Sequence, residues 1–228
     1  MTGTAVHPWP LLDVLSQGAA PECAAGDVLY LHGFGEQGAD LREFVGRTLP
    51  DGAAARLPTL RGHGQGARPS WGYTPSDFAA DLQRTFTDLH RHAVVGFSFG
   101  GIVASAYALA VGPERVSGLV VLDQAFESRP ERTETGEWAE AVHMKWQYDY
   151  THHLRAAAAV GIPVLLVHAD DSQVVGEAER AAWRSGSVPG LQVVAVPGGH
   201  ADLVRGNCTA ACVTGEFLSG LHDAEGRT

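Results

Sequence analysis

Short apolar runs alternate with longer amphipathic stretches from Asp27 onward. The apolar runs are rich in Val, Leu and Ile, which is typical of strands buried on both faces of a parallel sheet. Alternation with amphipathic stretches predicts crossover helices, and therefore an α/β fold with a mostly parallel sheet flanked by helices. We expect the strands at Val28–Leu31, Ala53–Leu57, Ala93–Phe97, Val116–Leu122, Pro163–His168 and Leu191–Val196.

The stretches between these strands have the polar and apolar spacing of helices. One begins at Pro75, followed by Ser76 and Asp77, a composition typical of a helix start. Neither an internal repeat nor a low-complexity linker divides the 228 residues, so we expect a single domain over residues 1–228. The predicted helices are Ala39–Leu49, Pro75–Arg91, Gly100–Val111, Glu177–Ser185 and Ala201–Leu218.

Two segments depart from the alternating pattern. Residues 126–150 are rich in Glu, Arg and Trp and fall between the fourth and fifth predicted strands. An insertion there lies over the carboxyl ends of the strands, where ligands bind in open α/β sheets, so we predict a small lid that is helical from Glu137 to Tyr148. About 26 residues precede the first predicted strand, and they include Pro8, Pro10 and an Ala- and Gly-rich stretch.

Composition and charge narrow the class of protein. Hydrophobic residues make up 45% and charged residues 18% of the chain, which predicts a globular protein. The formal net charge is −10, Lys145 is the only lysine, and no basic stripe is present, so we expect no nucleic-acid partner. The first 17 residues lack a basic start, and no run reaches the roughly 18 apolar residues of a membrane span. We therefore expect a cytoplasmic protein without membrane association.

The cysteines do not predict a metal centre. The chain has three, at Cys23, Cys208 and Cys212, and no further ligands follow the last two. We expect three reduced thiols, and neither a metal nor an organic cofactor.

The strongest chemical signal is the motif G-x-S-x-G at Gly96–Gly100. It falls between a predicted strand and a predicted helix, the setting in which a serine is presented on a sharp, strained turn. A serine hydroxyl is a weak nucleophile until a base accepts its proton. His200 follows the last strand on the Gly-rich loop Val196–Gly199, so Ser98 and His200 are the predicted nucleophile and general base.

A second glycine-rich turn supplies candidate hydrogen-bond donors. Leu31-His32-Gly33-Phe34-Gly35 ends the first predicted strand. The backbone N–H groups of Phe34 and Phe99 are the predicted oxyanion hole for a tetrahedral intermediate. We interpret His32 itself as a structural, hydrogen-bonding residue.

These motifs together resemble the α/β-hydrolase superfamily. The resemblance runs from Asp27 to about Leu218 and implies a Ser-acid-His triad, while His63 matches a structural loop residue of the family. It also implies an antiparallel hairpin near the N-terminus, whose absence from the pattern predicts a reduced sheet edge. The matching segments, in the family's order, are His32–Gly35, Leu60–Gly64, Gly96–Gly101, Ile162–His168 and Gly198–His200.

The acidic residue of the implied triad departs from the usual family pattern. Most relatives carry it after the penultimate strand, where this chain has Ser172, and a serine cannot stabilise an imidazolium as a carboxylate does. The neighbouring Asp171 or Asp170 is one solution. The other is Asp123, which ends the preceding strand and is similar in place to the acid of thioesterase domains of peptide and polyketide synthases. We favour Asp123, with Asp171 as the alternative.

The resulting hypothesis is acyl transfer to water from a small-molecule ester or thioester. Four of the aromatic residues in the predicted lid either line an acyl-binding wall or merely pack the lid: Trp138, Trp146, Tyr148 and Tyr150. A non-hydrolytic enzyme on the same scaffold, such as a lyase or cyclase, is the alternative, because a fold does not determine its chemistry. A non-catalytic binding module is the third possibility. His152 and His153 are assigned no chemistry.

Overall fold

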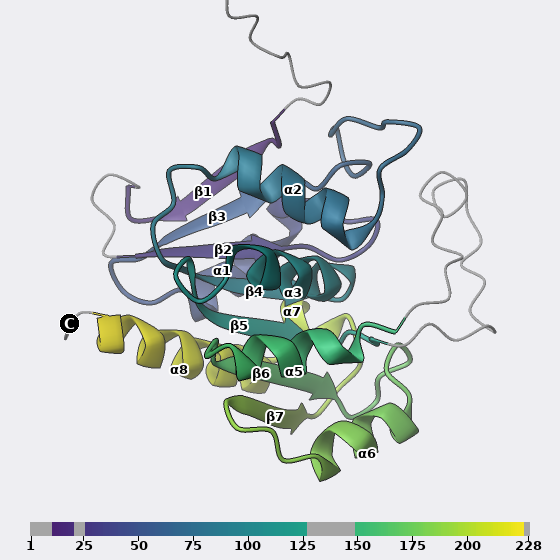
Figure 1. The fold of residues 1–228 in the computed structure, drawn as a ribbon. Helices are drawn as coiled ribbons and strands as arrows, with labels where there is room; N and C mark the ends of the chain where they lie inside the picture. The colour runs from purple at the N-terminus through teal and green to yellow at the C-terminus, as the bar shows by residue number, and fades with distance from the viewer. Residues whose placement is uncertain (1–10, 21–25, 127–148, 226–228) are drawn as a thin grey trace, which may run out of the picture.

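The protein is described by a computed structural model that covers residues 11–20, 26–126 and 149–225. A seven-stranded sheet runs through it in the order β1-β3-β2-β4-β5-β6-β7 (Figure 1). All six predicted strands are present, each to within one residue at either end, and they pair in parallel as expected. The strands are β1 (Val14–Gly18), β2 (Asp27–Leu31), β3 (Ala54–Pro58), β4 (His92–Phe97), β5 (Val116–Leu122), β6 (Val164–Ala169) and β7 (Leu191–Val196).

The N-terminal edge of the sheet holds a strand that the pattern did not predict. β1 pairs antiparallel with β3, with Val14 opposite Pro58 and Gly18 opposite Ala54. Its sequence, VLSQG, contains two polar residues and a glycine, so it lacks the apolar run that marks the other strands. Within the described residues, this single antiparallel strand forms the edge.

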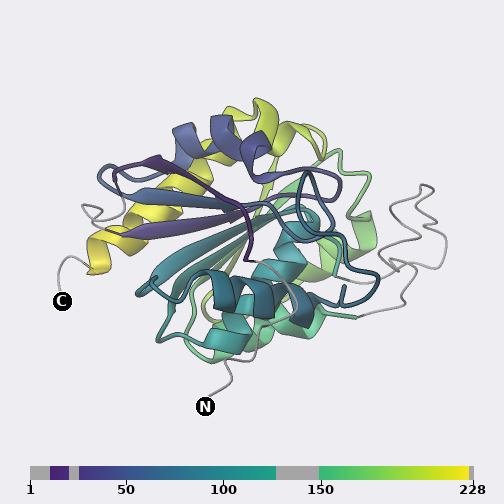
Figure 2. The same cartoon turned by 90° about the horizontal axis from the view of Figure 1, so that it is seen from above.

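Helices cover both faces of the sheet (Figures 1 and 2). The helices α2, α3 and α5 lie on one face, while α1, α7 and α8 lie on the other. None of the helices in the described part of the chain is both long and apolar enough to cross a membrane. The helical segments are η2 (Gly38–Leu41, a 3₁₀ turn), α1 (Arg42–Thr48), α2 (Pro75–Thr85), α3 (Phe99–Val111), α5 (Thr151–Ala159), α6 (Glu177–Ser185), α7 (Asp202–Arg205) and α8 (Cys208–Glu225).

Three of the predicted helices differ in their bounds or continuity. The one expected at Ala39–Leu49 begins as the 3₁₀ turn η2 and continues as α1. The one expected over Pro75–Arg91 ends at Thr85, because Phe86 leaves the helical region and turns into the core. The one expected over Ala201–Leu218 is broken by Gly206, whose φ of 155° no right-handed helix accommodates.

Helix α5 was not predicted at all. Its sequence is THHLRAAAA, and Leu154 and Ala157 pack into the core beside α3. The signal for it was present, since alanine has the highest intrinsic helix propensity. The helix predicted from Glu137 to Tyr148, and with it most of the predicted lid, lies outside the described residues.

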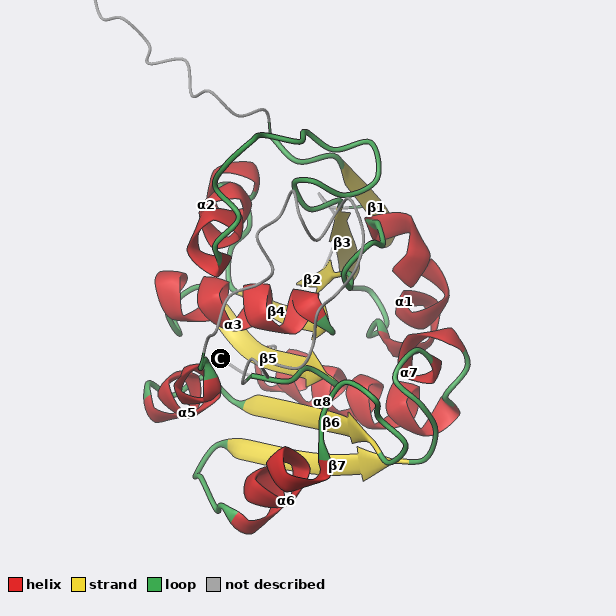
Figure 3. Cartoon of the chain, turned by 90° about the vertical axis from the view of Figure 1, so that its right-hand side faces the viewer, coloured by secondary structure: helices red, strands yellow, loops and turns green. Residues whose placement is uncertain are grey.

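The sheet directs the side chains of each strand alternately into two apolar clusters. In β6, Val164 and Leu166 face the cluster under α3 and α5, whereas Leu165 and Val167 face the cluster under α1 and α8. Burial on both faces explains the continuous apolar runs by which the strands were predicted. Figure 3 views the molecule from the side toward which the arrows of β5, β6 and β7 point in Figure 1.

Candidate active site

Ser98 lies on the tight connection between β4 and α3. Its backbone has φ 51° and ψ −127°, an unfavourable conformation for a residue with a side chain. The turn is possible because its glycines allow close approach: a Cβ on Gly96 would lie 2.3 Å from the carbonyl oxygen of Gly100, and one on Gly100 would lie 2.3 Å from that of Leu31. The G-x-S-x-G motif therefore meets a steric requirement of this turn.

Asp123 is the other strained position. Among the described residues, Ser98 and Asp123 are the two non-glycine residues with positive φ, at 51° and 48°. The N–H of Ser98 donates to the carbonyl of Leu122 at 2.9 Å, and the N–H of Asp123 donates to that of Val167 at 2.8 Å. These bonds hold both residues directly beyond the ends of neighbouring strands. Strain of this kind persists where the surrounding structure enforces it, often at functional sites.

His200 joins these two residues. Its Nε2 lies 3.0 Å from Ser98 Oγ, and its Nδ1 lies 2.8 Å from Asp123 Oδ2. A carboxylate only accepts hydrogen bonds, so Nδ1 carries the proton and Nε2 is left to accept from the serine hydroxyl. The imidazole stacks on the ring of Phe97, with 4.8 Å between ring centroids. The geometry is that required for a base to deprotonate Ser98.

The Asp123 carboxylate is fully buried and surrounded by donors. Its Oδ1 accepts the N–H of Ala169 at 3.0 Å, and its Oδ2 accepts the Ser172 hydroxyl at 2.6 Å. The Nδ1 of His168 lies 3.9 Å from Oδ1, beyond hydrogen-bonding distance. Burial by itself raises the pKa of the Asp123 carboxyl, but the contacts around it, those with His168 and His200 foremost, outweigh burial and hold this pKa well below its usual range. The group is therefore ionised at neutral pH.

The alternative acids are not at the imidazole. The side chains of Asp170 and Asp171 are exposed, and the backbone N–H of Asp171 donates to Gly198 at 3.0 Å. Both ring nitrogens of His200 already have partners in Ser98 and Asp123. The sequence marks Ser172 only as a residue unsuited to be the acid, and it does not predict the hydrogen bond from Ser172 to Asp123. The signal that could have revealed it is a serine at the position where relatives carry the acid.

Phe34 and Phe99 lie side by side at the ends of β2 and β4. Their rings meet edge to face, with 6.4 Å between centroids. The N–H of Phe99 belongs to the first turn of α3, where such groups have no partner within the helix. The loop of Phe34 is held by Glu36, which accepts the N–H of Gly33 and the guanidinium of Arg205, each at 2.9 Å.

His32 and His63 are buried and support this loop. In His32, Nδ1–H donates to the Gly33 carbonyl at 2.8 Å and Nε2 accepts the N–H of Leu60 at 3.0 Å. The Nδ1–H of His63 donates to the carbonyl of Arg61 at 2.9 Å. Burial lowers the pKa of His32 to about 4 and that of His63 to about 3, so both are neutral at physiological pH. Their contacts are those of structural residues.

The two ends of the predicted lid meet beside the site. Phe126 follows Asp123 by three residues, and its carbonyl accepts the N–H of Tyr150 at 2.8 Å. The N–H of Phe126 donates to the buried carboxylate of Glu179 at 2.8 Å. Of the four aromatic residues predicted either to line an acyl-binding wall or to pack the lid, Tyr150 packs against the core. The other three, Trp138, Trp146 and Tyr148, lie outside the described residues.

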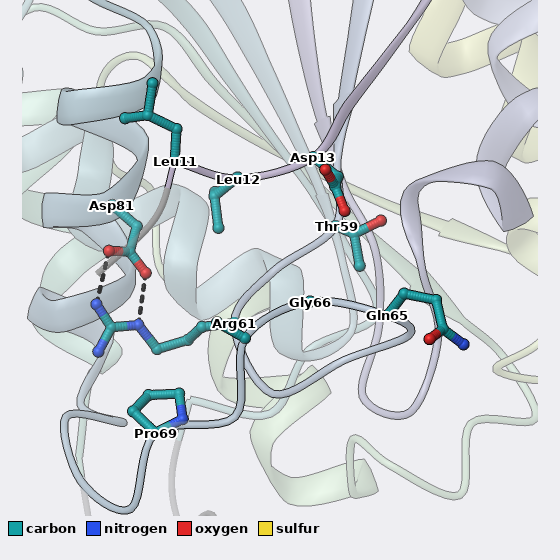
Figure 4. A pocket seen from close by; sticks show the side chains of 10 residues that line it. Leu11, Leu12, Asp13, Thr59, Arg61, Gln65, Gly66, Pro69 and Asp81 are labelled. Atoms are coloured by element: carbon teal, nitrogen blue, oxygen red, sulfur yellow. Dashed lines mark hydrogen bonds and ion pairs between the residues drawn. The ribbon is translucent and has the colours of Figure 1, made fainter. Parts of the chain in front are cut away.

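A separate cavity of about 160 Å³ lies by β1 and the loop that follows β3 (Figure 4). Arg61 and Asp81 form a buried two-pronged ion pair across its wall, with N···O distances of 2.5 and 2.6 Å. Arg61 also donates to the carbonyl of Gly72 at 2.5 Å. The guanidinium is thus engaged in holding α2 to the loop. The lining is Leu11, Leu12, Asp13, Thr59, Arg61, Gln65, Gly66, Ala67, Pro69 and Asp81, without the residues around Ser98.

The described cysteines and carboxylates form no metal centre. Cys208 and Cys212 are exposed free thiols. Cys23 lies outside the described residues. In the described part of the chain, no three or more His, Cys, Asp or Glu side chains gather in a way that could hold a metal ion.

Comparison with known proteins gives the family. Residues 28–150 match the family model described as alpha/beta hydrolase fold, which is more than half of the chain. The chain therefore belongs to the α/β-hydrolase fold family, as its motifs and its sheet indicated. Among curated proteins, none matches the chain by sequence.

Solved structures share the fold at low sequence identity. A thermophilic esterase from Thermogutta terrifontis is 21% identical, with a TM-score of 0.73 over 92% of this chain and 94% of its own. An α/β hydrolase from Novosphingobium aromaticivorans is 19% identical, with a TM-score of 0.70 over 91% and 93%. The thioesterase domain from the curacin biosynthetic pathway is 18% identical, with a TM-score of 0.66 over 88% and 93%. At these identities the likeness extends to the fold alone.

Proposed function

We propose that this protein is a serine hydrolase that cleaves a carboxylic ester or thioester of a small molecule through an acyl-enzyme on Ser98. One observation carries the proposal: the hydrogen-bonded series from Ser98 Oγ to His200 Nε2 and from His200 Nδ1 to Asp123, at 3.0 and 2.8 Å. Family membership and esterase and thioesterase structures of the same fold support hydrolysis of this class.

The chemistry begins with proton transfer from Ser98 Oγ to His200 Nε2 as the oxygen attacks the carbonyl carbon. Asp123 stabilises the imidazolium and stays ionised. The backbone N–H groups of Phe34 and Phe99 stabilise the negative oxygen of the tetrahedral intermediate. The imidazolium then protonates the departing alcohol or thiol, leaving the acyl group on Ser98. His200 next deprotonates a water molecule, which attacks the acyl carbon; the imidazolium then returns this proton to Ser98 Oγ as the bond between Oγ and the acyl carbon breaks and the carboxylic acid leaves.

The test is hydrolysis of nitrophenyl esters and acyl thioesters of increasing chain length by the wild type, Ser98→Ala and His200→Ala. We expect activity in the wild type and a loss of about 10⁴-fold or more in kcat for either variant. Ser185→Ala and His90→Ala alter exposed residues of the same types and serve as matched controls that keep full activity.

Labelling gives a second measurement, independent of the acyl group chosen. An active-site-directed fluorophosphonate is expected to modify the wild type at Ser98, as identified by mass spectrometry of the labelled peptide. A folded wild type that neither hydrolyses any of these substrates nor takes up the label would overturn the proposed hydrolase function.

A further inference from the structure

The Ser172 hydroxyl has three hydrogen-bond partners, and they determine the direction of its proton. Its oxygen lies 3.1 Å from the N–H of Val174 and 2.9 Å from that of Val175, both of which donate to it. The third partner is Asp123 Oδ2 at 2.6 Å, which only accepts. The single hydroxyl proton of Ser172 is therefore directed at the same carboxylate oxygen that accepts from His200.

The loop that carries Ser172 is held in place by hydrogen bonds from α6. Arg180 of α6 is buried, and its guanidinium donates to the carbonyls of Val175 at 2.9 Å, Ser172 at 3.3 Å and Ala169 at 3.4 Å. The N–H of Ala169 holds the other oxygen of Asp123. A single anchored segment, residues 169–175, thus supplies one donor to each oxygen of the carboxylate.

The orientation of a carboxylate is set by such donors, because rotation about the terminal bond of an aspartate has a broad, shallow energy profile. We propose that Ser172 is a positioning residue, whose hydroxyl holds the Asp123 carboxylate plane so that Oδ2 faces His200 Nδ1. This inference rests on the proposed function, in which the orientation of His200 governs the rate. Without the hydroxyl, the carboxylate is hydrogen-bonded by the Ala169 N–H and the His200 imidazole, with His168 Nδ1 farther away at 3.9 Å, and His200 spends less time aligned with Ser98.

The first experiment compares Ser172→Ala with Ser172→Thr, which retains a hydroxyl at the same atom. Because a bond to a charged group is lost, we expect Ser172→Ala to lower kcat by about tenfold with KM unchanged. Ser172→Thr restores most of the rate. Ser185→Ala, on the exposed end of α6, is the matched control. Wild-type kcat in a folded Ser172→Ala variant would overturn the inference, as would equal losses in the Ala and Thr variants.

The second experiment does not depend on turnover. The proton on Nδ1 of His200, shared with a carboxylate, gives a low-field signal in proton NMR spectra, which His200→Ala identifies by its absence. We expect the wild type and Ser172→Thr to show it and Ser172→Ala to lose or broaden it, because a loosely held proton exchanges with water. An unchanged signal in Ser172→Ala contradicts the inference. If the wild type neither hydrolyses nor takes up the label, yet its signal is lost in Ser172→Ala, the proposed function falls, while the part of the inference that concerns how Ser172 orients Asp123 and His200 stands.

Discussion

At the scale of single residues, Asp123 is distinguished from the other nearby carboxylates by burial and by its donors. Its side chain is inaccessible to solvent and accepts hydrogen bonds on both oxygens, whereas Asp170 and Asp171 are exposed. A buried ionised group is tolerated only when it is paired and hydrogen-bonded, and Asp123 meets that condition through His200, Ser172 and Ala169.

Substitution separates the candidate acids. We expect Asp123→Asn to lower kcat by about 10⁴-fold, because a neutral amide neither stabilises the imidazolium nor holds the tautomer with Nε2 free. Asp171→Asn changes an exposed side chain, and its kcat is expected to stay within about twofold of the wild type. The measurement is kcat on the best ester found, with folding checked by circular dichroism. The reverse ranking would assign the acid to Asp171.

At the scale of elements, the strand-turn-helix unit around Ser98 depends on the contact between the backbones of β4 and α3. The Cβ that Ala would bring to position 96 meets the carbonyl oxygen of Gly100 at 2.3 Å, and backbone atoms cannot rotate away as a flexible side chain does. We expect Gly96→Ala to lower the free energy of unfolding by more than about 3 kcal/mol, as clashes in packed regions do.

Gly220 provides the matched control for this prediction. It lies exposed in α8, and a Cβ there would meet no atom within 4 Å. Gly220→Ala is expected to leave stability unchanged or raise it by about 0.5–1 kcal/mol, since alanine favours a helix over glycine. Urea unfolding of both variants measures the difference. Equal stabilities for Gly96→Ala and the wild type would show that the turn can open without cost.

The burial and pairing of individual strands explain which parts of the fold could be predicted from the sequence. The strands β2 to β6 are mostly buried on both faces and carry apolar runs for that reason, while β7 keeps an apolar run although most of its residues are only partly buried or exposed, so all six parallel strands were predicted closely. β1 has no such run. Its position depends on its pairing with β3, and the local sequence pattern carries no information about that pairing. The break at Gly206 likewise reflects a backbone conformation, which glycine permits but does not impose.

The residues of the candidate site likewise divide into those with a local sequence signal and those whose contacts depend on how distant segments pair. Ser98 and His200 were predicted because each has a local signal, a motif at a strand-helix junction and a glycine-rich loop after a strand. For the acid, the sequence favoured Asp123 but kept Asp171 as an alternative, because His200 lies 77 residues from Asp123 and their contact depends on how β5, β6 and β7 align. The role of Ser172 was missed for the same reason: its partner Asp123 is 49 residues away in the sequence, and the two residues meet because they follow the neighbouring strands β6 and β5.

At the scale of the whole molecule, buried neutral histidines make stability dependent on pH. Burial lowers the pKa of His32 to about 4 and of His63 to about 3, whereas both titrate near 6.5 in the unfolded chain. Between these values the unfolded state binds more protons than the folded state. Stability is therefore complete above about pH 6.5 and declines as the pH falls toward the pKa values of the folded state.

The contribution of one histidine can be isolated with His63→Asn, which keeps a side-chain donor near the position of Nδ1 and removes the titrating group. Linkage predicts that each such histidine costs about 2 kcal/mol of stability between pH 7 and pH 5. We therefore expect the free energy of unfolding of the wild type to fall between pH 7 and pH 5 by about 2 kcal/mol more than that of His63→Asn. Urea titrations of both proteins at both pH values measure this difference. His90→Asn, at an exposed histidine, should follow the wild type. Identical pH dependence in all three proteins would mean that His63 becomes protonated in the folded state without opposition, which its complete burial beside His32 and Phe99 argues against.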